Sequence, residues 1–392
     1  MGAAGKTPRM GLTASGFTEK QTTKVCHITS AHGPEDVRIF HKECVSLARN
    51  GYETYLVQRG ESYEKNGVHI VGFGEVTGGR LKRMTQVARR AYQMALSMDA
   101  DIYHFHDPEL LSYGLRLKKK GKKVIFDSHE CYVEQIQIKP YLPPWAAALA
   151  ARLYGAYERR VLRRLDAAIL PCTFDGKNPF EGQCVRAPII NNAAILGEFY
   201  ELHEPTAPKK DRQICYVGGL TENRGITAGI QAAAKAGARL ALAGEFSPAG
   251  YEDALRAMPE FSCVDYWGRL SRAEVAALLS ESCAGLCTLL DRGQYWKSDT
   301  FSIKVFEYMS MGLPVVLSPS SYNRKMVAKY QFGLCADPEN PEEIASAIRY
   351  LLDHPEEARQ MGENGRRAVK EEFNWDVEEK KLLALYEEIL KE

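Results

Sequence analysis

Residues 214–236 read ICYVGGLTENRGITAGIQAAAKA, and their pattern indicates the architecture of the surrounding chain. The apolar run 214–217 predicts a strand, and the alanine-rich run 228–236 predicts a helix. Between them a glycine pair leaves the strand and Gly225 opens the helix, so backbone N–H groups could approach a phosphate while Arg224 adds a charged contact. The stretch is therefore a candidate diphosphate cradle. The alternative is a tight strand-to-helix turn with Arg224 on the surface.

The same alternation of strand and helix continues in both directions along the chain. Strands are predicted at 25–28, 52–57, 68–71, 102–105, 124–126, 167–170, 240–242, 264–267, 285–290 and 314–317. Strands that alternate with helices at this spacing predict parallel sheets covered on both faces. The expected fold class is α/β, with two Rossmann-like doubly wound domains facing across a cleft, where ligands bind at the carboxyl ends of strands.

A polar, proline-containing stretch near residues 189–212 separates the two series and is interpreted as the hinge. The first residues are rich in glycine and lack periodicity, which predicts a flexible tail. The last residues form an amphipathic pattern. The predicted division is a tail at 1–23, an N-terminal domain at 24–195, a C-terminal domain at 196–374, and a helix at 375–392 that crosses back to the N-terminal domain.

Composition and charge exclude several classes of protein. The 392 residues are 45% hydrophobic and 26% charged, as in an ordinary globular chain. There is no membrane-length apolar run and no signal-peptide pattern, so we expect a cytoplasmic protein. The ten cysteines form no C-x-x-C pair, which favours neither a disulfide framework nor a structural zinc site. Residues 1–200 carry 28 Lys and Arg against 20 Asp and Glu, whereas the rest carries 23 against 30, which argues against general nucleic-acid binding.

A second informative segment, residues 298–317, reads SDTFSIKVFEYMSMGLPVVL. Lys304 and Glu307 are predicted near each other beside an apolar helical stripe, with Ser302 in the first turn of that helix. A helix start and a lysine suit an anion, and a carboxylate suits the vicinal hydroxyls of a ribose. The alternative is an ordinary Lys/Glu pair on the surface.

Polar residues follow several predicted strands of the first series, where the functional groups of doubly wound sheets collect. Each of them has the alternative reading of a capped loop or a hydrogen-bonded surface side chain, and Asp36 is equally suited to capping a helix. These residues are His32, Asp36, Arg38, His106, Asp107, His129 and Glu130.

Basic residues gather in three runs of the first domain, and such runs usually form a solvated face or complement helix C-termini. Anionic lipid, however, attracts each nearby Lys or Arg by about 1 kcal/mol. We therefore hypothesise peripheral docking on the inner face of a membrane, which liposome flotation would test. The runs are Arg80, Lys82, Arg83, Arg89 and Arg90; Lys118, Lys119, Lys120, Lys122 and Lys123; and Arg159, Arg160, Arg163 and Arg164.

Taken together, the motifs resemble those of the GT-B glycosyltransferases, specifically the retaining enzymes of family 4, over nearly the whole chain from Lys24. The motifs that carry the resemblance occur in the order of the family: HITSAHGPEDVRIFHKE at 27–43, LARNGYE at 47–53, HFHDPELL at 104–111, DSHE at 127–130, the loop at 218–225, and FEYMSMGLPVV at 306–316. The resemblance makes the first domain the acceptor side and the second the nucleotide-sugar side.

The resemblance also implies roles for individual residues of the donor site. Glu307 is expected to bind the ribose, and His129 the donor hexose. The residues expected to bind the donor are Gly218, Gly219, Arg224, Gly244, Trp267, Arg269, Asp299, Ser302, Lys304 and Glu307, with Trp267 and Arg269 near the nucleobase. The expected catalytic residues are His129, His106, Asp107, Arg224 and Lys304, and those of the acceptor side are His32, Asp36, Arg38 and Glu130. Gly244 and the 267–269 stretch have simple turn chemistry as their alternative.

Two positions depart from the family pattern. The first carboxylate of the E-x7-E pair is Asp299, which is one methylene shorter, and the arginine that often follows the first loop glycine is here Gly219. The charge on the diphosphate must then rest on Arg224, with Lys304 as a compensating cation.

The implied reaction moves a hexose from a nucleoside diphosphate sugar to an acceptor hydroxyl with retention at the anomeric carbon. UDP is preferred over GDP, and the acceptor is expected to be a glycan or a polyprenyl-linked sugar of surface polysaccharide assembly. No metal or other cofactor is required, and the sequence has no D-x-D motif placed to bind a metal. The alternatives are a nucleotide-sugar epimerase, a glycogen-type phosphorylase and a catalytically weak nucleotide-sugar-binding protein.

Overall fold

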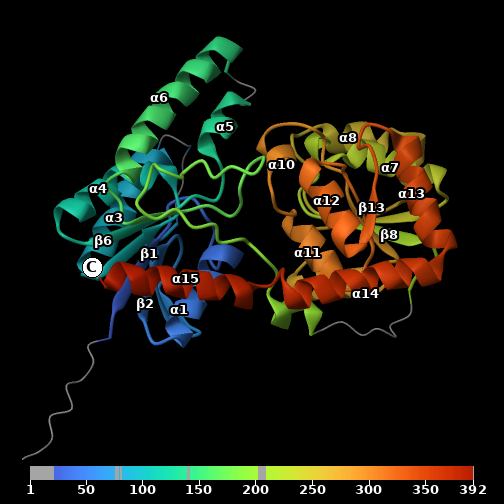
Figure 1. Ribbon diagram of the computed structural model, residues 1–392. Coiled ribbons are helices and arrows are strands. Elements are labelled where there is room, and N and C mark those ends of the chain that lie inside the picture. Colours follow the sequence, from blue (N-terminus) through green and yellow to red (C-terminus); the bar gives the residue numbers. More distant parts are fainter. Residues whose placement is uncertain (1–21, 76–78, 80–81, 139–141, 202–208, 392) are drawn as a thin grey trace, which may run out of the picture.

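The structure is a computed structural model that describes residues 22–391 except 76–78, 80–81, 139–141 and 202–208. Residues 1–21 of the expected tail, Arg80 and part of the expected hinge therefore lie outside the described residues. Within the described part, two α/β units stand side by side, each built on its own sheet (Figure 1). The expectation of two doubly wound domains is confirmed.

The first sheet has seven strands in the order β3-β4-β2-β1-β5-β6-β7. All neighbouring strands are parallel except the β3–β4 pair, which is antiparallel. Its central strands are buried along their length, as expected for a sheet covered on both faces. The strands are β1 (Lys24–Ile28), β2 (Glu53–Gln58), β3 (Tyr63–Lys65), β4 (Val68–Gly72), β5 (Ile102–Phe105), β6 (Lys123–Asp127) and β7 (Ala167–Ile169).

The helices of this unit connect successive strands. They are η1 (Val37–Cys44), α1 (Val45–Arg49), η2 (Arg83–Val87), α3 (Ala88–Ser97), η3 (Pro108–Leu110), α4 (Leu111–Lys119), α5 (Tyr132–Gln137) and α6 (Pro144–Leu162). The sequence pattern did not reveal that η1 is a π-helix. Asp36 begins η1, and its side chain accepts hydrogen bonds from the backbone N–H groups of Arg38 and Ile39. The wide turns of η1 place Arg38, Lys42 and Glu43 in the interior.

The second sheet has six parallel strands in the order β10-β9-β8-β11-β12-β13. The strands are β8 (Gln213–Val217), β9 (Arg239–Ala243), β10 (Val264–Gly268), β11 (Ala284–Cys287), β12 (Val315–Leu317) and β13 (Gly333–Cys335). The helices are η4 (Leu196–Tyr200), η5 (Glu222–Arg224), α7 (Ile226–Lys235), α8 (Tyr251–Arg256), η6 (Pro259–Cys263), α9 (Arg272–Ser280), α10 (Gln294–Lys297), α11 (Ile303–Ser310), α12 (Ser321–Tyr330), α13 (Pro341–Asp353) and α14 (Pro355–Glu371).

The last helix, α15 (Trp375–Leu390), leaves the second unit and packs on the first (Figure 1). Leu382, Leu385 and Ile389 are buried together with Val25 and Ile125 of the first sheet. The two units are therefore joined by apolar burial at the end of the chain as well as by the segment before β8. No helix among the described residues is long and apolar enough to cross a membrane.

Candidate active site

A cavity of about 500 Å³ lies between the two units. The first unit contributes Arg38, His129 and Glu130 to its wall, and the second contributes the loop after β8 and the start of α11. Among the residues expected to bind the donor, the cavity brings together Gly218, Gly219, Arg224, Ser302, Lys304 and Glu307.

Lys304 is a buried cation on the wall that the second unit contributes. Its amine is buried, donates a hydrogen bond to the Tyr216 hydroxyl (Nζ to oxygen 2.6 Å) and lies 3.8 Å from the centre of the Tyr216 ring. Burial lowers the pKa of Lys304 to about 8, with the nearby Arg224 guanidinium acting in the same direction. Among the described residues, no carboxylate forms a salt bridge with the Lys304 amine, and Glu307 pairs instead with Arg272. The amine is therefore available to an anion that enters the cavity, and burial would strengthen that interaction.

The loop after β8 approaches this amine with its backbone. Gly218 has φ of 133°, and a Cβ at this position would lie 3.0 Å from the Lys304 amine. A Cβ on Gly219 would meet nothing within 4 Å. Gly225 must be a glycine for a different reason: a Cβ at this position would lie 1.9 Å from the Thr288 carbonyl oxygen. Close backbone packing therefore explains Gly225, whereas Gly218 and Gly219 line the cavity.

Glu307 lies one turn after Lys304 on α11 and is also buried. Its Oε1 accepts a hydrogen bond from Arg272 Nη1 at 2.7 Å, and Arg272 Nη2 reaches Glu198 at 2.6 Å. Burial raises the pKa of Glu307, and the Arg272 guanidinium opposes this effect. Arg272, the first residue of α9, was missed from the sequence because its pairing with Glu307 spans 35 residues.

A smaller cavity of about 240 Å³ adjoins the same glycine loop. Gly244, Glu245 and Arg269 line it together with Gly218 and Gly219. Gly244 is required by the backbone, since a Cβ there would lie 1.9 Å from the Gly218 carbonyl oxygen.

Trp267 lines neither of these two cavities. Its neighbour on β10, Tyr266, donates a hydrogen bond to the Gly244 carbonyl at 3.0 Å, and side chains alternate along a strand. Trp267 therefore faces away from this loop, is half exposed, and lies under the Lys210 amine. The sequence expectation that Trp267 lies beside the nucleobase is corrected.

On the other side of the main cavity, the side chain of His129 lines the wall. His106 and Asp127 are buried behind His129, whose Nε2 lies 3.2 Å from His106 Nδ1 and 3.5 Å from Asp127 Oδ2. Arg38 holds Asp127 in a bidentate contact, with Nε and Nη2 at 2.7 and 3.0 Å from its two oxygens. The charge of Arg38 therefore offsets the burial of Asp127 and holds the pKa of that carboxyl below its usual range.

His106 and Asp107 were expected to act on the substrate, but both are fully buried behind the wall. Asp107 accepts hydrogen bonds from the Ser30 N–H at 2.6 Å and the Thr29 hydroxyl at 2.8 Å, and it lies 3.2 Å from His32 Nδ1. Burial opposes protonation of His32, but the hydrogen bond and charge of Asp107 raise its pKa. His106 and Asp107 are therefore positioning residues, because they hold His129 and the loop at 29–32.

His32 packs its ring against His129, with ring centres 4.3 Å apart. Asp36 is the helix cap described above, so the capping alternative holds for this residue. Glu130 accepts a hydrogen bond from the Tyr295 hydroxyl at 2.8 Å, and the Arg224 guanidinium lies 5.6 Å from the Tyr295 ring centre. The wall formed by the first unit is thus connected to Arg224 through one tyrosine.

Asp299 does not line the main cavity. Its Oδ2 accepts hydrogen bonds from the Thr173 hydroxyl at 2.6 Å and from the Gly176 N–H at 2.7 Å, both on the segment that follows β7. The expectation that Asp299 contacts the donor sugar is therefore replaced by a contact between the two units.

Two Rossmann-like units with a cavity between them are the architecture of a GT-B protein. Two family models match the chain. The one described as Glycosyltransferase Family 4 matches residues 37–178, and the one described as Glycosyl transferases group 1 matches residues 201–368. The chain belongs to the family 4 glycosyltransferases of the GT-B fold and is a hexosyltransferase.

Relatives and solved structures agree with this membership. The chain is 25% identical over 314 residues to the MMP alpha-(1->4)-mannosyltransferase of Mycolicibacterium hassiacum, which covers 77% of this chain and 74% of that protein. Its fold matches sucrose-phosphate synthase from Thermosynechococcus elongatus with a TM-score of 0.73 and 18% identity, over 94% and 99% of the two chains. It also matches the Anabaena protein HepE in complex with UDP-glucose, with a TM-score of 0.66 and 12% identity, over 93% and 99%.

Proposed function

We propose that this protein transfers a hexose from a nucleoside diphosphate sugar, with UDP preferred over GDP, to a hydroxyl of a glycan or lipid-linked acceptor, with retention at the anomeric carbon. The observation that carries this proposal is the buried Lys304 amine beside Gly218 in the cavity between the units. The fold match to a HepE complex with UDP-glucose supports a uridine nucleotide as donor.

The donor would lie along the wall of the second unit. Its diphosphate would contact Lys304, Arg224 and the backbone near Gly219, while Glu307 binds the ribose hydroxyls. The smaller cavity beside Gly244 would receive the nucleobase. Because Glu307 is already held by Arg272, its carboxylate is oriented before the ribose arrives.

Chemistry would then occur where the hexose meets His129. Lys304 and Arg224 would stabilise the charge that grows on the leaving diphosphate as the glycosidic bond breaks. The departing phosphate, rather than an enzyme base, would take the proton of the acceptor hydroxyl on the same face of the sugar. Closure of the two units would exclude water and limit hydrolysis of the donor.

A lipid-linked acceptor would require the protein to reach a membrane surface, and α6 offers a face for this. Trp145, Leu149 and Leu153 follow one another at four-residue spacing and are 73%, 51% and 63% exposed. Exposed arginines lie along the helix at Arg152, Arg159 and Arg160 and directly after its end at Arg163 and Arg164. An apolar stripe next to basic residues is suited to an anionic bilayer interface. The protein would thus act as a peripheral membrane enzyme on the cytoplasmic face.

Thermal unfolding with a panel of nucleotides and nucleotide sugars tests the donor proposal. A donor at 100 times its dissociation constant should stabilise the protein by about 2.7 kcal/mol. Lys304→Met should lose this stabilisation, and the exposed Lys297→Met, on the neighbouring helix α10, should retain it. If no nucleoside diphosphate or nucleotide sugar stabilises the wild-type protein, the proposal is wrong.

A further inference from the structure

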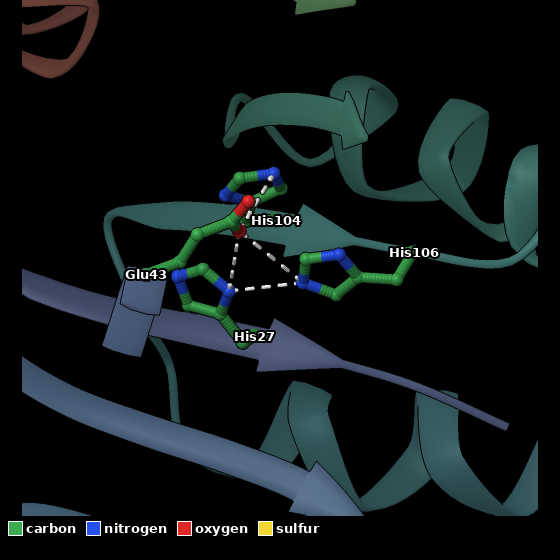
Figure 2. Close-up of side chains that lie close together, drawn as sticks. All are labelled: His27, Glu43, His104 and His106. Atoms are coloured by element: carbon green, nitrogen blue, oxygen red, sulfur yellow. Dashed lines mark hydrogen bonds and ion pairs between the residues drawn. The ribbon is translucent and has the colours of Figure 1, made fainter. Parts of the chain in front are cut away.

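Four buried side chains converge beneath the acceptor-side wall. His27 comes from β1, Glu43 from η1, and His104 and His106 from β5 and its end. All four are fully buried, and Figure 2 shows the three imidazoles arranged around the Glu43 carboxylate. A pure packing role would not require four polar side chains at one point in a domain core.

The distances between the donor atoms are those of a small coordination site. Glu43 Oε2 lies 3.9 Å from His27 Nδ1, from His104 Nε2 and from His106 Nε2. His27 Nδ1 and His106 Nε2 are 3.0 Å apart, and the four atoms all lie within 4.8 Å of one another (Figure 2). A tetrahedral zinc ion with bonds of about 2.0 to 2.1 Å places its ligand atoms about 3.4 Å apart. The site would need to contract by about half an ångström on the Glu43 side.

Hydrogen bonds between the described residues do not satisfy this cluster. Both oxygens of Glu43 and the Nε2 atom of His104 are buried without a hydrogen-bond partner. Arg38 Nε lies 3.2 Å from Glu43 Oε1 as an ion pair, and Oε2 is the oxygen that faces the three imidazoles. One proton between His27 and His106 would account for that 3.0 Å contact. It would leave Glu43 and His104 facing each other at 3.9 Å with no bond between them. An ion at the centre would satisfy all four groups together.

The outward nitrogens of the three imidazoles have the partners that metal-bound histidines need. His27 Nε2 and His104 Nδ1 lie 3.3 and 2.8 Å from the Tyr386 hydroxyl of α15. His106 Nδ1 lies 3.4 Å from Asp127 Oδ2. Each ring can therefore carry its proton on the outward nitrogen and direct the lone pair of the inward nitrogen at the shared centre.

We propose that His27, Glu43, His104 and His106 bind one structural zinc ion. Three imidazoles and one carboxylate, closed from solvent, suit zinc in a four-coordinate site. This ion is separate from the donor site, for which we expect no metal.

A second group, His106, Asp127 and His129, also brings ligand atoms together. Both oxygens of its carboxylate, Asp127, accept hydrogen bonds from Arg38, whereas Arg38 contacts only Oε1 of Glu43 and leaves Oε2 for a ligand. The second group is therefore a poorer cation site. Through His106, zinc in the four-residue site would fix the proton of Nδ1 toward Asp127 and so orient His129 at the wall. Through Tyr386, it would also anchor α15 on the first unit.

The test measures metal content in the full chain purified without a polyhistidine tag. We expect about one zinc per chain by plasma mass spectrometry. Glu43→Gln should lose it, and the exposed His69→Gln control should keep it. Cobalt added to protein stripped with a chelator should give the visible absorption of tetrahedral Co²⁺ in the wild type.

Two results would overturn the zinc site: wild-type protein that contains no stoichiometric metal and gives no tetrahedral cobalt spectrum, or Glu43→Gln protein with unchanged metal content. The cobalt measurement on wild-type protein remains informative even if Glu43→Gln does not fold. UDP titration of the same samples separates this outcome from failure of the proposed donor site, because the donor residues lie in the second unit.

Discussion

The amine of Lys304 lies 2.6 Å from the hydroxyl of Tyr216 and 3.8 Å from the centre of its ring. Tyr216 is on β8 and Lys304 on α11, so the contact joins the strand that precedes the glycine loop to the helix that begins at the cavity. The tyrosine holds the cation in place without neutralising it. The Lys304 amine is therefore positioned for an anion before any ligand arrives.

The lowered pKa of Lys304 predicts that UDP binding weakens in alkaline solution. Below about pH 8 the amine carries its proton and attracts the diphosphate, whereas above about pH 8 binding must take up a proton. Affinity should fall by up to about tenfold per pH unit above that value, until the pKa of the bound state is reached. Calorimetric titration of UDP at several pH values measures this, and Lys304→Met should remove the dependence. An affinity that stays constant to about pH 9 would contradict the assignment.

The surroundings of the glycine pair after β8 predict unequal effects of the same substitution at its two positions. Gly218→Ala introduces a Cβ at positive φ, 3.0 Å from the Lys304 amine, and should cost about 1 to 2 kcal/mol of stability and weaken UDP binding. Gly219→Ala meets no atom within 4 Å and should change both by less than about 0.5 kcal/mol. Chemical denaturation and UDP titration of the two variants provide the comparison. Equal effects would show that the loop geometry differs from that described.

Because a Cβ on Gly219 would meet nothing within 4 Å, we expect Gly219→Arg to be tolerated and to add a cation to the cavity wall. We expect UDP to bind about two- to tenfold more tightly, mostly at low ionic strength, because the added charge is partly exposed. Gly219→Gln is the matched neutral control and should not tighten binding. Tighter binding by both variants, independent of salt, would point to packing rather than charge.

The pair formed by Glu307 and Arg272 predicts a positioning role for the arginine. Arg272→Met leaves the buried Glu307 carboxylate without its 2.7 Å partner and should lower the free energy of unfolding by about 1 to 3 kcal/mol. The double variant with Glu307→Gln should regain part of that stability while UDP binding stays lost. Denaturant unfolding together with UDP titration checks both statements, and full UDP affinity in Glu307→Gln would exclude a ribose contact.

The exposed face of α6 predicts salt-sensitive binding to anionic membranes. Replacement of Trp145, Leu149 and Leu153 by serine should abolish flotation with anionic vesicles, because three large apolar side chains leave the bilayer interface. Tyr350→Ser, an exposed aromatic on α13 of the other unit, is the control. Unchanged flotation of the triple variant would assign docking to the basic residues alone or to another face.

Sequence periodicity was sufficient to predict the α/β fold, and the residues quoted from two motifs lie together on one wall of the cavity. The glycine pair, Lys304 and Glu307 are close in sequence to a strand end or share one helix, so local spacing predicts their location. Helices α12, α13 and α14 were not among the predicted elements, although the structure shows them clearly.

Residues held by distant partners could not be placed from sequence. Arg38 enters the interior because η1 is a π-helix, and it meets Asp127 across 89 positions. Asp299 contacts the segment at 173–176 rather than the cavity, and Trp267 faces away through strand alternation. Such pairings depend on how the two sheets and the units meet, which a single sequence does not encode as a local pattern.

The most direct measurement is a crystal structure of the protein with bound UDP. The diphosphate oxygens should lie within hydrogen-bond distance of Lys304 and Arg224, with the ribose hydroxyls against Glu307 and the base near Gly244. A nucleotide bound elsewhere, or a diphosphate that contacts neither cation, would contradict the assignment of the donor site to the second unit.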